Sequence, residues 1–167
     1  DARETERVLK GTGIEVPRLP DYAPVIWDYW ERNLDPDLFK DRTLKGTVEG
    51  RVCVVTGATS GIGLATAQKL ADAGAILVIG ARKLERLKEV TAELESRGAS
   101  VHAYPCDFSD MEACDEFVKT VLDNHGHVDV LVNNAGRSIR RSLDLSFDRF
   151  HDFERTMQLN YFGSVRL

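Results

Sequence analysis

From residue 50 onward, the hydrophobic positions of the chain follow two alternating patterns. Short apolar runs rich in β-branched residues predict strands, and longer segments with apolar residues at helical spacing predict helices. Because these segments alternate with short turns between them, the pattern predicts a parallel sheet with helices on both faces. The predicted strands are 52–56, 75–79, 100–104 and 128–133, and the predicted helices are 61–73, 83–97, 109–124 and roughly 147–167.

Single residues predict two details of these helices. In the first helix, helical spacing places Ile62, Ala65, Leu70 and Ala73 on the side that faces the sheet. Ser109 is expected to cap the third helix, because a serine hydroxyl accepts a hydrogen bond from the free amides at a helix start.

The first 50 residues differ in composition from the rest, since they hold both tryptophans and every proline except Pro105. Proline lacks an amide donor and disfavours helix at the residue before it. Residues 1–23 are therefore expected to form a mostly extended arm or inter-domain linker. We accordingly divide the chain into an arm at residues 1–50 and an α/β domain at residues 51–167.

An aromatic segment lies inside this arm. Residues 25–30 predict a short helix with Ile26, Tyr29 and Trp30 on one face, and residues 35–37 predict a turn or a new helix start. The aromatic face could dock on another domain, or it could pack on the edge of its own domain. We favour the second interpretation, because tryptophans are usually buried.

Composition narrows the class of protein. The 167 residues carry a net charge of −5 and are 43% hydrophobic and 29% charged, which is typical of a soluble globular protein. No apolar run approaches the roughly 18 residues of a membrane helix, and the polar start is no signal peptide. The acidic balance argues against nucleic acid as a partner. Three cysteines without metal-ligand spacing predict no metal site and favour a cytoplasmic location.

The strongest local signal is the glycine-rich segment 56–63, which follows the first predicted strand and opens the first predicted helix. Gly57 permits the tight turn, Gly61 permits close approach of a pyrophosphate, and Gly63 permits close packing of helix and strand. The free amides at the helix start then favour an anion. An ordinary strand–helix connection is the alternative, but this context favours a nucleotide-binding site.

The G-x-x-x-G-x-G spacing of this turn resembles the short-chain dehydrogenase/reductase family. Three further motifs lie in that family's order, at residues 106–109, 133–136 and 157–163. The resemblance covers residues 51–167 and implies a Rossmann-like doubly wound parallel sheet. Only the N-terminal, cofactor-binding part of that α/β fold is expected in this chain.

The resemblance also implies roles for individual residues. The cofactor-binding residues would be Gly57, Ser60, Gly61, Ile62, Gly63, Asp107, Phe108, Asn134, Ala135 and Gly136. Asn160 matches the helix asparagine that holds a water in the family's proton relay, which would make it a catalytic residue. Judged from the residues alone, Asn133 and Asn134 could instead brace the sheet, and Asp107 could cap the following helix.

Charge at the end of the second strand predicts which cofactor is bound. An NAD-preferring enzyme places a carboxylate there to bind the ribose hydroxyls, whereas this chain has Arg82 and Lys83. A guanidinium can pair with a 2′-phosphate in bidentate fashion, so we expect NADP rather than NAD. The alternative is that both residues only begin a solvated helix.

A basic loop follows the third motif, with three arginines at Arg137, Arg140 and Arg141. By resemblance it borders the substrate entrance, where it could attract a phosphorylated or thioester-linked substrate such as an acyl-CoA. Alternatively, the arginines could pair with Asp144 and Asp148.

The family's chemistry uses a Tyr-x-x-x-Lys pair and an upstream serine, and this chain contains no Tyr-x-x-x-Lys. We therefore expect the chain to be part of a larger reductase and to be inactive alone. The alternative is a non-catalytic nucleotide-binding or scaffolding module. Homo-oligomerisation of the intact protein is expected, because the helix that carries Asn160 contributes to subunit contacts in the family.

A narrower resemblance joins the arm to the domain. Residues 29–37 and 133–143 look like the second reductase domain of bacterial two-domain fatty acyl-CoA reductases. This resemblance implies a preceding domain, and a carbonyl or acyl-CoA substrate that is reduced with NADPH.

Overall fold

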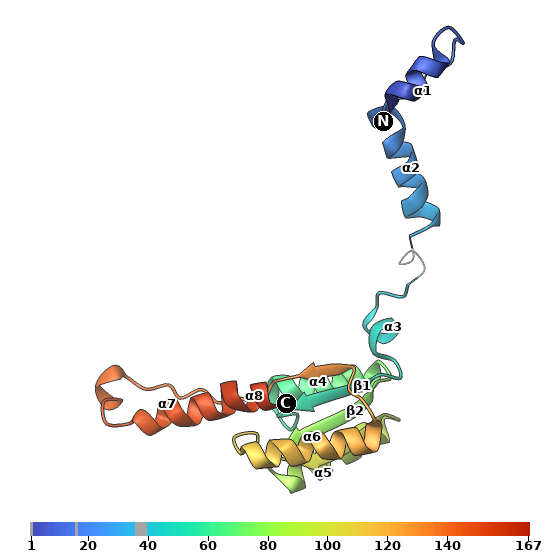
Figure 1. Ribbon diagram of the computed structural model, residues 1–167. Coiled ribbons are helices and arrows are strands. Elements are labelled where there is room, and N and C mark those ends of the chain that lie inside the picture. Colours follow the sequence, from blue (N-terminus) through green and yellow to red (C-terminus); the bar gives the residue numbers. More distant parts are fainter. Residues whose placement is uncertain (1, 16, 36–39) are drawn as a thin grey trace. The chain divides into compact units, whose positions relative to one another are not determined.

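A computed structural model describes the chain except for residues 1, 16 and 36–39 (Figure 1). The chain divides into two compact units, Asp1–Lys40 and Asp41–Leu167, which we describe separately. The domain boundary that composition predicts after residue 50 stays a prediction. The expected turn at residues 35–37 lies largely outside the described residues.

The larger unit is built on one parallel sheet. Its strands are β1 (Val52–Thr56), β2 (Ile76–Ala81), β3 (Ser100–Pro105) and β4 (Val130–Val132), in the order β3-β2-β1-β4. All four predicted strands are therefore confirmed, although β4 is shorter than expected. The chain crosses from β3 over the sheet to β4 on the far side of β1. Such a reversal in the order of the strands opens a crevice at their carboxyl ends.

Helices cover both faces of the sheet, as predicted. Helices α4 (Gly61–Asp72) and α5 (Leu84–Ser96) pack on one face, and α6 (Met111–His125) packs on the other. Successive residues of a strand point to opposite faces. Val55 accordingly belongs to the core under α4 and α5, and Val54 belongs to the core under α6. All three cysteines are buried in these cores, and burial raises the pKa of the Cys106 thiol to about 12.

Of the four residues predicted to face the sheet from the first helix, α4, two are buried and two are exposed. Leu70 and Ala73 are buried, but Ile62 is 80% exposed and Ala65 is also exposed. The buried side is set by Gly63, where a side chain would collide with the Gly57 carbonyl oxygen. Because successive helix residues are 100° apart, Ile62 faces away from the sheet when Gly63 faces it.

The predicted cap of α6 is wrong by one residue. Asp110 caps the helix, and its Oδ1 accepts hydrogen bonds from the amides of Glu112 (3.0 Å) and Ala113 (3.3 Å). Ser109 instead donates to the Asp107 carboxylate, through its amide at 3.0 Å and its hydroxyl at 2.7 Å. Asp107 therefore holds its own loop and does not cap the helix.

The long helix expected near the end of the chain begins later and is not uniform. A 3₁₀ turn (η1, Leu143–Leu145) precedes α7 (Phe150–Met157), a π-helical turn (η2, Gln158–Phe162) and α8 (Gly163–Arg166). In Figure 1 the last three elements run on as one rod. Gly163 packs on the Phe108 carbonyl oxygen, where a side chain would not fit. This contact brings the end of the rod to the loop after β3.

The arm is helical, so the expectation of a mostly extended segment is wrong. It contains α1 (Ala2–Leu9) and α2 (Leu19–Asn33), and the short α3 (Leu44–Val48) belongs to the larger unit. Pro20 lies in the first turn of α2, where its missing amide costs nothing because the first amides of a helix lack partners. Pro24 also lies inside the helix, where it removes a single bond near the start.

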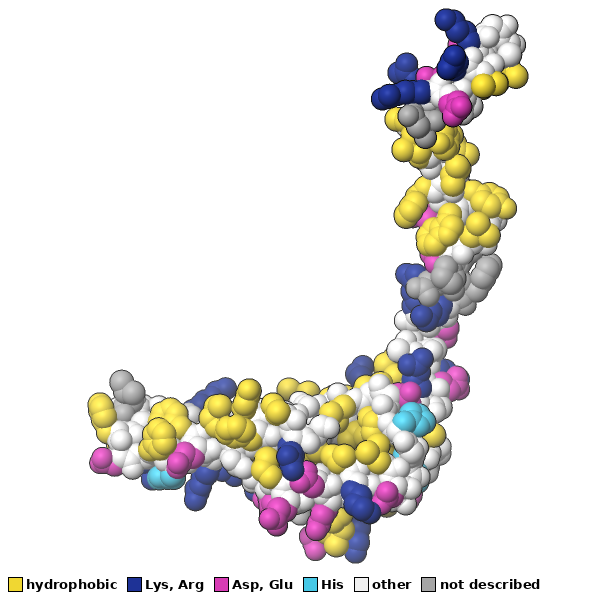
Figure 2. Space-filling model, in the orientation of Figure 1, with side chains coloured by type: hydrophobic (Ala, Val, Ile, Leu, Met, Phe, Trp, Pro, Cys, Tyr) yellow, Lys and Arg dark blue, Asp and Glu magenta, His cyan; other side chains and the backbone are white. Residues whose placement is uncertain are grey.

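The aromatic segment lies within α2, which confirms the helix predicted there. Figure 2 shows hydrophobic side chains gathered over this helix. Trp27 and Trp30 are 61% and 39% exposed, and their ring centroids are 5.5 Å apart. Docking and edge packing both stay predictions for this segment. Among the described residues, no helix is both long and apolar enough to cross a membrane.

Candidate functional site

The glycine-rich turn lies at the carboxyl end of β1, in the crevice that the strand order opens. Gly57 has a φ of 67°, and a side chain on it would lie 2.9 Å from the Cα of Ala135. Only glycine meets both conditions without strain. Ser60 precedes the first turn of α4 but caps none of its amides. The start of α4 therefore keeps amide donors for an anion.

Thr56 and Asn134 join the ends of β1 and β4. Thr56 is 1% exposed, and its hydroxyl accepts hydrogen bonds from the amides of Asn134 (3.0 Å) and Ala135 (2.9 Å). The Asn134 side-chain amide donates to the carbonyl oxygens of Thr56 (2.9 Å) and Gly57 (3.2 Å). Asn134 thus braces the sheet beside the glycine turn. Asn133 instead donates to the Ser164 carbonyl oxygen at 3.3 Å.

A cleft of about 610 Å³ lies above these strand ends. It brings together most of the residues that sequence predicts for the cofactor, whereas Gly61 and Gly63 lie in the adjoining helix start and do not line it. The predicted residues that line it are Gly57, Ser60, Ile62, Arg82, Lys83, Asp107, Phe108, Asn134, Ala135 and Gly136.

Cations outnumber the single carboxylate in this cleft. Arg82 Nη1 lies 3.9 Å from Asp107 Oδ2, and Lys83 follows at the start of α5. Burial raises the pKa of the Asp107 carboxyl, but hydrogen bonds from Ser109 and the charges of Arg82 and Arg137 bring it below its usual value. The carboxylate is therefore ionised, and the remaining positive charge favours a phosphate.

Sequence reasoning missed Arg86 and the bonding role of Thr56. Arg86 lines the same cleft from the first turn of α5, with its Nη2 3.5 Å from the Thr59 carbonyl oxygen and an ion pair to Glu89. Its place in the first turn of the helix that follows Arg82 and Lys83 could have revealed it. A polar residue that ends an apolar strand could have revealed Thr56.

Asn160, the predicted catalytic residue, lies in a different cleft of about 550 Å³ between the basic loop and the α7 rod. It is part of the π-helical turn, a local irregularity that is frequent at functional sites. Its side chain bonds the backbone of Arg137, which also lines this cleft. The two clefts are lined by consecutive parts of the chain, since Asn134–Gly136 lines the first and the next residue, Arg137, lines the second.

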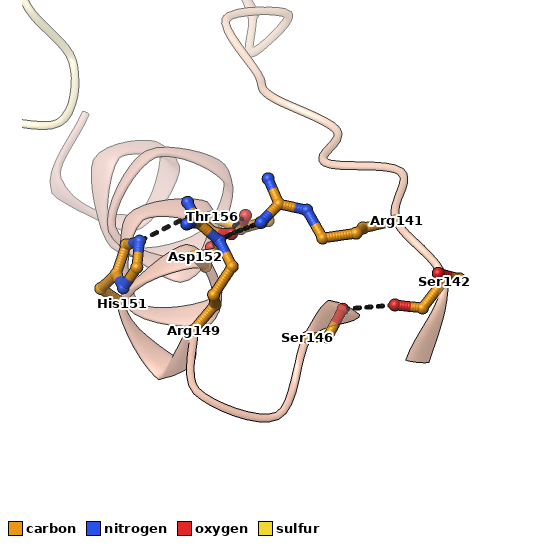
Figure 3. Close-up of polar contacts among 7 residues, drawn as sticks. All are labelled: Arg141, Ser142, Ser146, Arg149, His151, Asp152 and Thr156. Atoms are coloured by element: carbon orange, nitrogen blue, oxygen red, sulfur yellow. Dashed lines mark hydrogen bonds and ion pairs between the residues drawn. The ribbon is translucent and has the colours of Figure 1, made fainter. Parts of the chain in front are cut away.

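The basic loop pairs with a carboxylate that sequence did not predict. Arg141 Nη1 lies 3.4 Å from Asp152 Oδ2, so its partner is neither Asp144 nor Asp148 (Figure 3). Arg149 also binds Asp152, through its Nε at 2.8 Å. The described residues contain no group of three or more His, Cys, Asp or Glu side chains that could hold a metal ion.

Known proteins resemble this chain in sequence. A fatty acyl-CoA reductase of Acinetobacter baylyi is 55% identical over 120 residues, which cover 72% of this chain and 41% of that protein. An uncharacterized oxidoreductase of Mycobacterium bovis is 50% identical over 155 residues, covering 91% of this chain and 45% of that protein. The second match is longer than the α/β domain, so it includes most of the arm. The chain thus spans less than half the length of these two relatives.

A solved structure shows the same fold. A metagenomic short-chain oxidoreductase in complex with NADP superposes with a TM-score of 0.68 at 36% identity, over 72% of this chain and 54% of that one. The family model for short chain dehydrogenase matches residues 51–167, which is well over half of the chain. The sheet, the glycine turn and the motifs around the cleft therefore identify the chain as a member of the short-chain dehydrogenase family of oxidoreductases.

Proposed function

We propose that this chain supplies the cofactor-binding part of an NADP(H)-dependent oxidoreductase that interconverts a carbonyl and a hydroxyl group. The observation that carries the proposal is the convergence in one cleft of an uncapped helix start, three cations and the Asn134–Gly136 segment. These features fit a dinucleotide with an additional phosphate.

Each part of the cleft has a role in this proposal. The turn from Gly57 to Gly63 binds the pyrophosphate, and Arg82 and Lys83 bind the 2′-phosphate of the adenosine ribose. Asp107 and the Phe108 backbone contact the adenine, while Asn134, Ala135 and Gly136 line the site near the nicotinamide ribose. NADPH, when bound, supplies the hydride.

The remaining site residues position groups around that cofactor. Ser60, Gly61 and Ile62 lie at the helix start beside the pyrophosphate, and their backbone amides bind it. Asn160 acts through the water of a proton relay. The structural support for its position is its contact with Arg137, which follows the segment at the nicotinamide end of the cleft.

The proposed substrate is a fatty acyl-CoA or a fatty aldehyde. Its support is the 55% identity to the Acinetobacter baylyi fatty acyl-CoA reductase and the arginines beside an apolar wall in the second cleft. We further infer a homo-oligomeric, multidomain protein in the cytoplasm. The exposed Phe150 of α7, the separate arm and the three unpaired buried cysteines support these inferences.

Cofactor choice is tested by titration calorimetry with NADP⁺ and NAD⁺. We expect NADP⁺ to bind at least tenfold more tightly, because a charge-assisted bond to phosphate contributes about 1.5–3 kcal/mol. Arg82→Gln should remove most of this preference. Arg97→Gln is the matched control, since it removes the same charge from the far end of α5, where Arg97 pairs with Asp72. Equal affinity for both cofactors would contradict the proposal.

Activity is tested with the full-length protein. NADPH oxidation should depend on added fatty acyl-CoA or fatty aldehyde and should fall in the Arg82→Gln variant through a higher KM for NADPH. NADP⁺ binding without any carbonyl-dependent turnover would favour a non-catalytic nucleotide-binding module instead.

A further inference from the structure

The second cleft combines an apolar wall with a cationic wall. Ile139, Phe153 and Met157 form the apolar side and are 36%, 58% and 48% exposed. Arg141 and Arg149 form the cationic side at the outer end of the rod. A surface of this kind fits an elongated ligand that is anionic at one end and can pack its methylene and methyl groups on apolar side chains.

The cationic side is held in place by one carboxylate. Asp152 is 13% exposed and contacts Arg149, Arg141 and His151, the last at 3.2 Å between Oδ1 and Nε2 (Figure 3). Its backbone carbonyl accepts a hydrogen bond from the Thr156 hydroxyl at 2.7 Å. These contacts order the two guanidinium groups before any ligand binds, which lowers the entropy cost of binding.

Charge in the cleft favours an anion. Three arginines line it, namely Arg137, Arg141 and Arg149, against the single carboxylate of Asp152. The Asp152 carboxyl is ionised, because the hydrogen bond from Arg149 holds its pKa below the usual value. The lining therefore keeps a net positive charge after internal pairing. Phosphate groups are among the anions that a guanidinium binds in bidentate fashion.

The distance along the rod between its cationic end and Asn160 indicates the length of ligand that the cleft can hold. Arg149 lies at the start of α7, and Asn160 lies eleven residues after it. At 1.5 Å per residue, these two positions on the rod are about 16 Å apart. The thioester and the phosphates of coenzyme A are separated by the pantetheine arm, which is of similar length when extended.

We propose that this second cleft binds coenzyme A thioesters. The phosphates lie on Arg141 and Arg149, and the pantetheine arm runs along Ile139, Phe153 and Met157 toward Asn160. This inference rests on the proposed reductase function for its substrate class, but its binding site is separate from the cofactor cleft.

The ligand itself is tested first, by calorimetry on the full-length protein with saturating NADP⁺ to fill the cofactor cleft. Coenzyme A should bind, and pantetheine, which lacks the phosphates, should bind at least tenfold more weakly. Pantetheine binding as tightly as coenzyme A would overturn the phosphate assignment. Loss of coenzyme A binding when NADP⁺ is present would overturn the separate site.

Two arginines of the same loop then form a matched pair. Arg141→Gln removes a cleft guanidinium while Asp152 keeps Arg149 and His151, so the cluster is retained. Arg140→Gln makes the same charge change on a residue that does not line the cleft. We expect at least a tenfold loss of coenzyme A affinity in the first variant and less than a twofold change in the second.

The NADP⁺ affinity of both variants serves as the folding control and separates the two proposals. Unchanged NADP⁺ binding with weakened coenzyme A binding in Arg141→Gln alone supports the inference. Equal losses of coenzyme A affinity in both variants would indicate only a general electrostatic attraction to the basic loop. That result would overturn the inferred site. If NADP⁺ fails to bind the wild type, the proposed function falls, while the comparison of the two arginine variants still decides the coenzyme A site.

Discussion

The side chain of Asn160 makes both of its hydrogen bonds to the backbone of Arg137. Its Oδ1 accepts from the Arg137 amide at 2.8 Å, and its Nδ2 donates to the Arg137 carbonyl oxygen at 2.8 Å. This pairing ties the π-helical turn to the first residue of the basic loop. Asn160 therefore controls where that loop leaves the sheet.

Replacing this asparagine should loosen the loop. We expect Asn160→Ala to lower the free energy of unfolding by about 1–2 kcal/mol, because two hydrogen bonds are lost together. Asn124→Ala is the control, since Asn124 makes one side-chain bond to Thr120 on the exposed side of α6 and should change stability by less than about 0.5 kcal/mol. Urea denaturation measures both, and equal effects would contradict the prediction.

Loss of the buried Thr56 hydroxyl should lower the free energy of unfolding more than loss of a methyl group at the same position. Thr56→Val keeps the shape but leaves the amides of Asn134 and Ala135 without their acceptor, which should cost about 1–3 kcal/mol. Thr56→Ser keeps the hydroxyl and loses one methyl group, at about 1 kcal/mol. Denaturation should therefore rank serine above valine in stability, and the reverse order would show that packing dominates at this position.

Gly57 and Gly98 separate backbone strain from crowding. Both have positive φ, 67° and 85°, but a side chain on Gly98 meets nothing within 4 Å. Each alanine substitution should cost about 1–2 kcal/mol through the left-handed backbone. Only Gly57→Ala should also weaken NADP⁺ binding, by tenfold or more, because it displaces Ala135. A similar loss of affinity in Gly98→Ala would refute this explanation.

Acid should destabilise the protein through His125. Burial lowers the pKa of this imidazole, and the nearby His102 lowers it further. The unfolded chain then binds the proton more readily, so the stability from neutral His125 is complete above about pH 6.5 and is lost as pH falls below it. Measured between pH 7 and 5, the free energy of unfolding should fall less steeply in His125→Gln than in the wild type. Identical slopes would exclude this histidine as the cause.

Much of the sheet could be predicted because its signals are local. β1 is a run of five buried residues, and the hydrophobic pattern identified it to the residue. The glycine turn could also be predicted from the sequence, since the tight turn at Gly57 and the close packing at Gly63 leave room for no other residue. Local sequence was therefore sufficient wherever the backbone itself carries the constraint.

Other features depend on contacts between distant segments, which spacing does not reveal. Ile62 faces solvent because Gly63 packs on Gly57, and Arg141 pairs with Asp152, which lies eleven residues further along the chain in α7. The prediction of an extended arm is wrong for a different reason. Proline is expected to break a helix, but Pro20 and Pro24 lie in the first two turns of α2, where they remove few hydrogen bonds.

The bonds between Thr56 and Asn134 join residues 78 positions apart in the chain. A folding intermediate in which only β1, β2 and β3 have paired would contain the glycine turn. It would lack the Asn134–Gly136 segment, which forms the opposite wall of the cleft. Closing a loop of that length is entropically expensive and is completed only when β4 docks. A dinucleotide would therefore bind fully only after β4 has docked, and its binding would stabilise the complete sheet relative to every partly folded form.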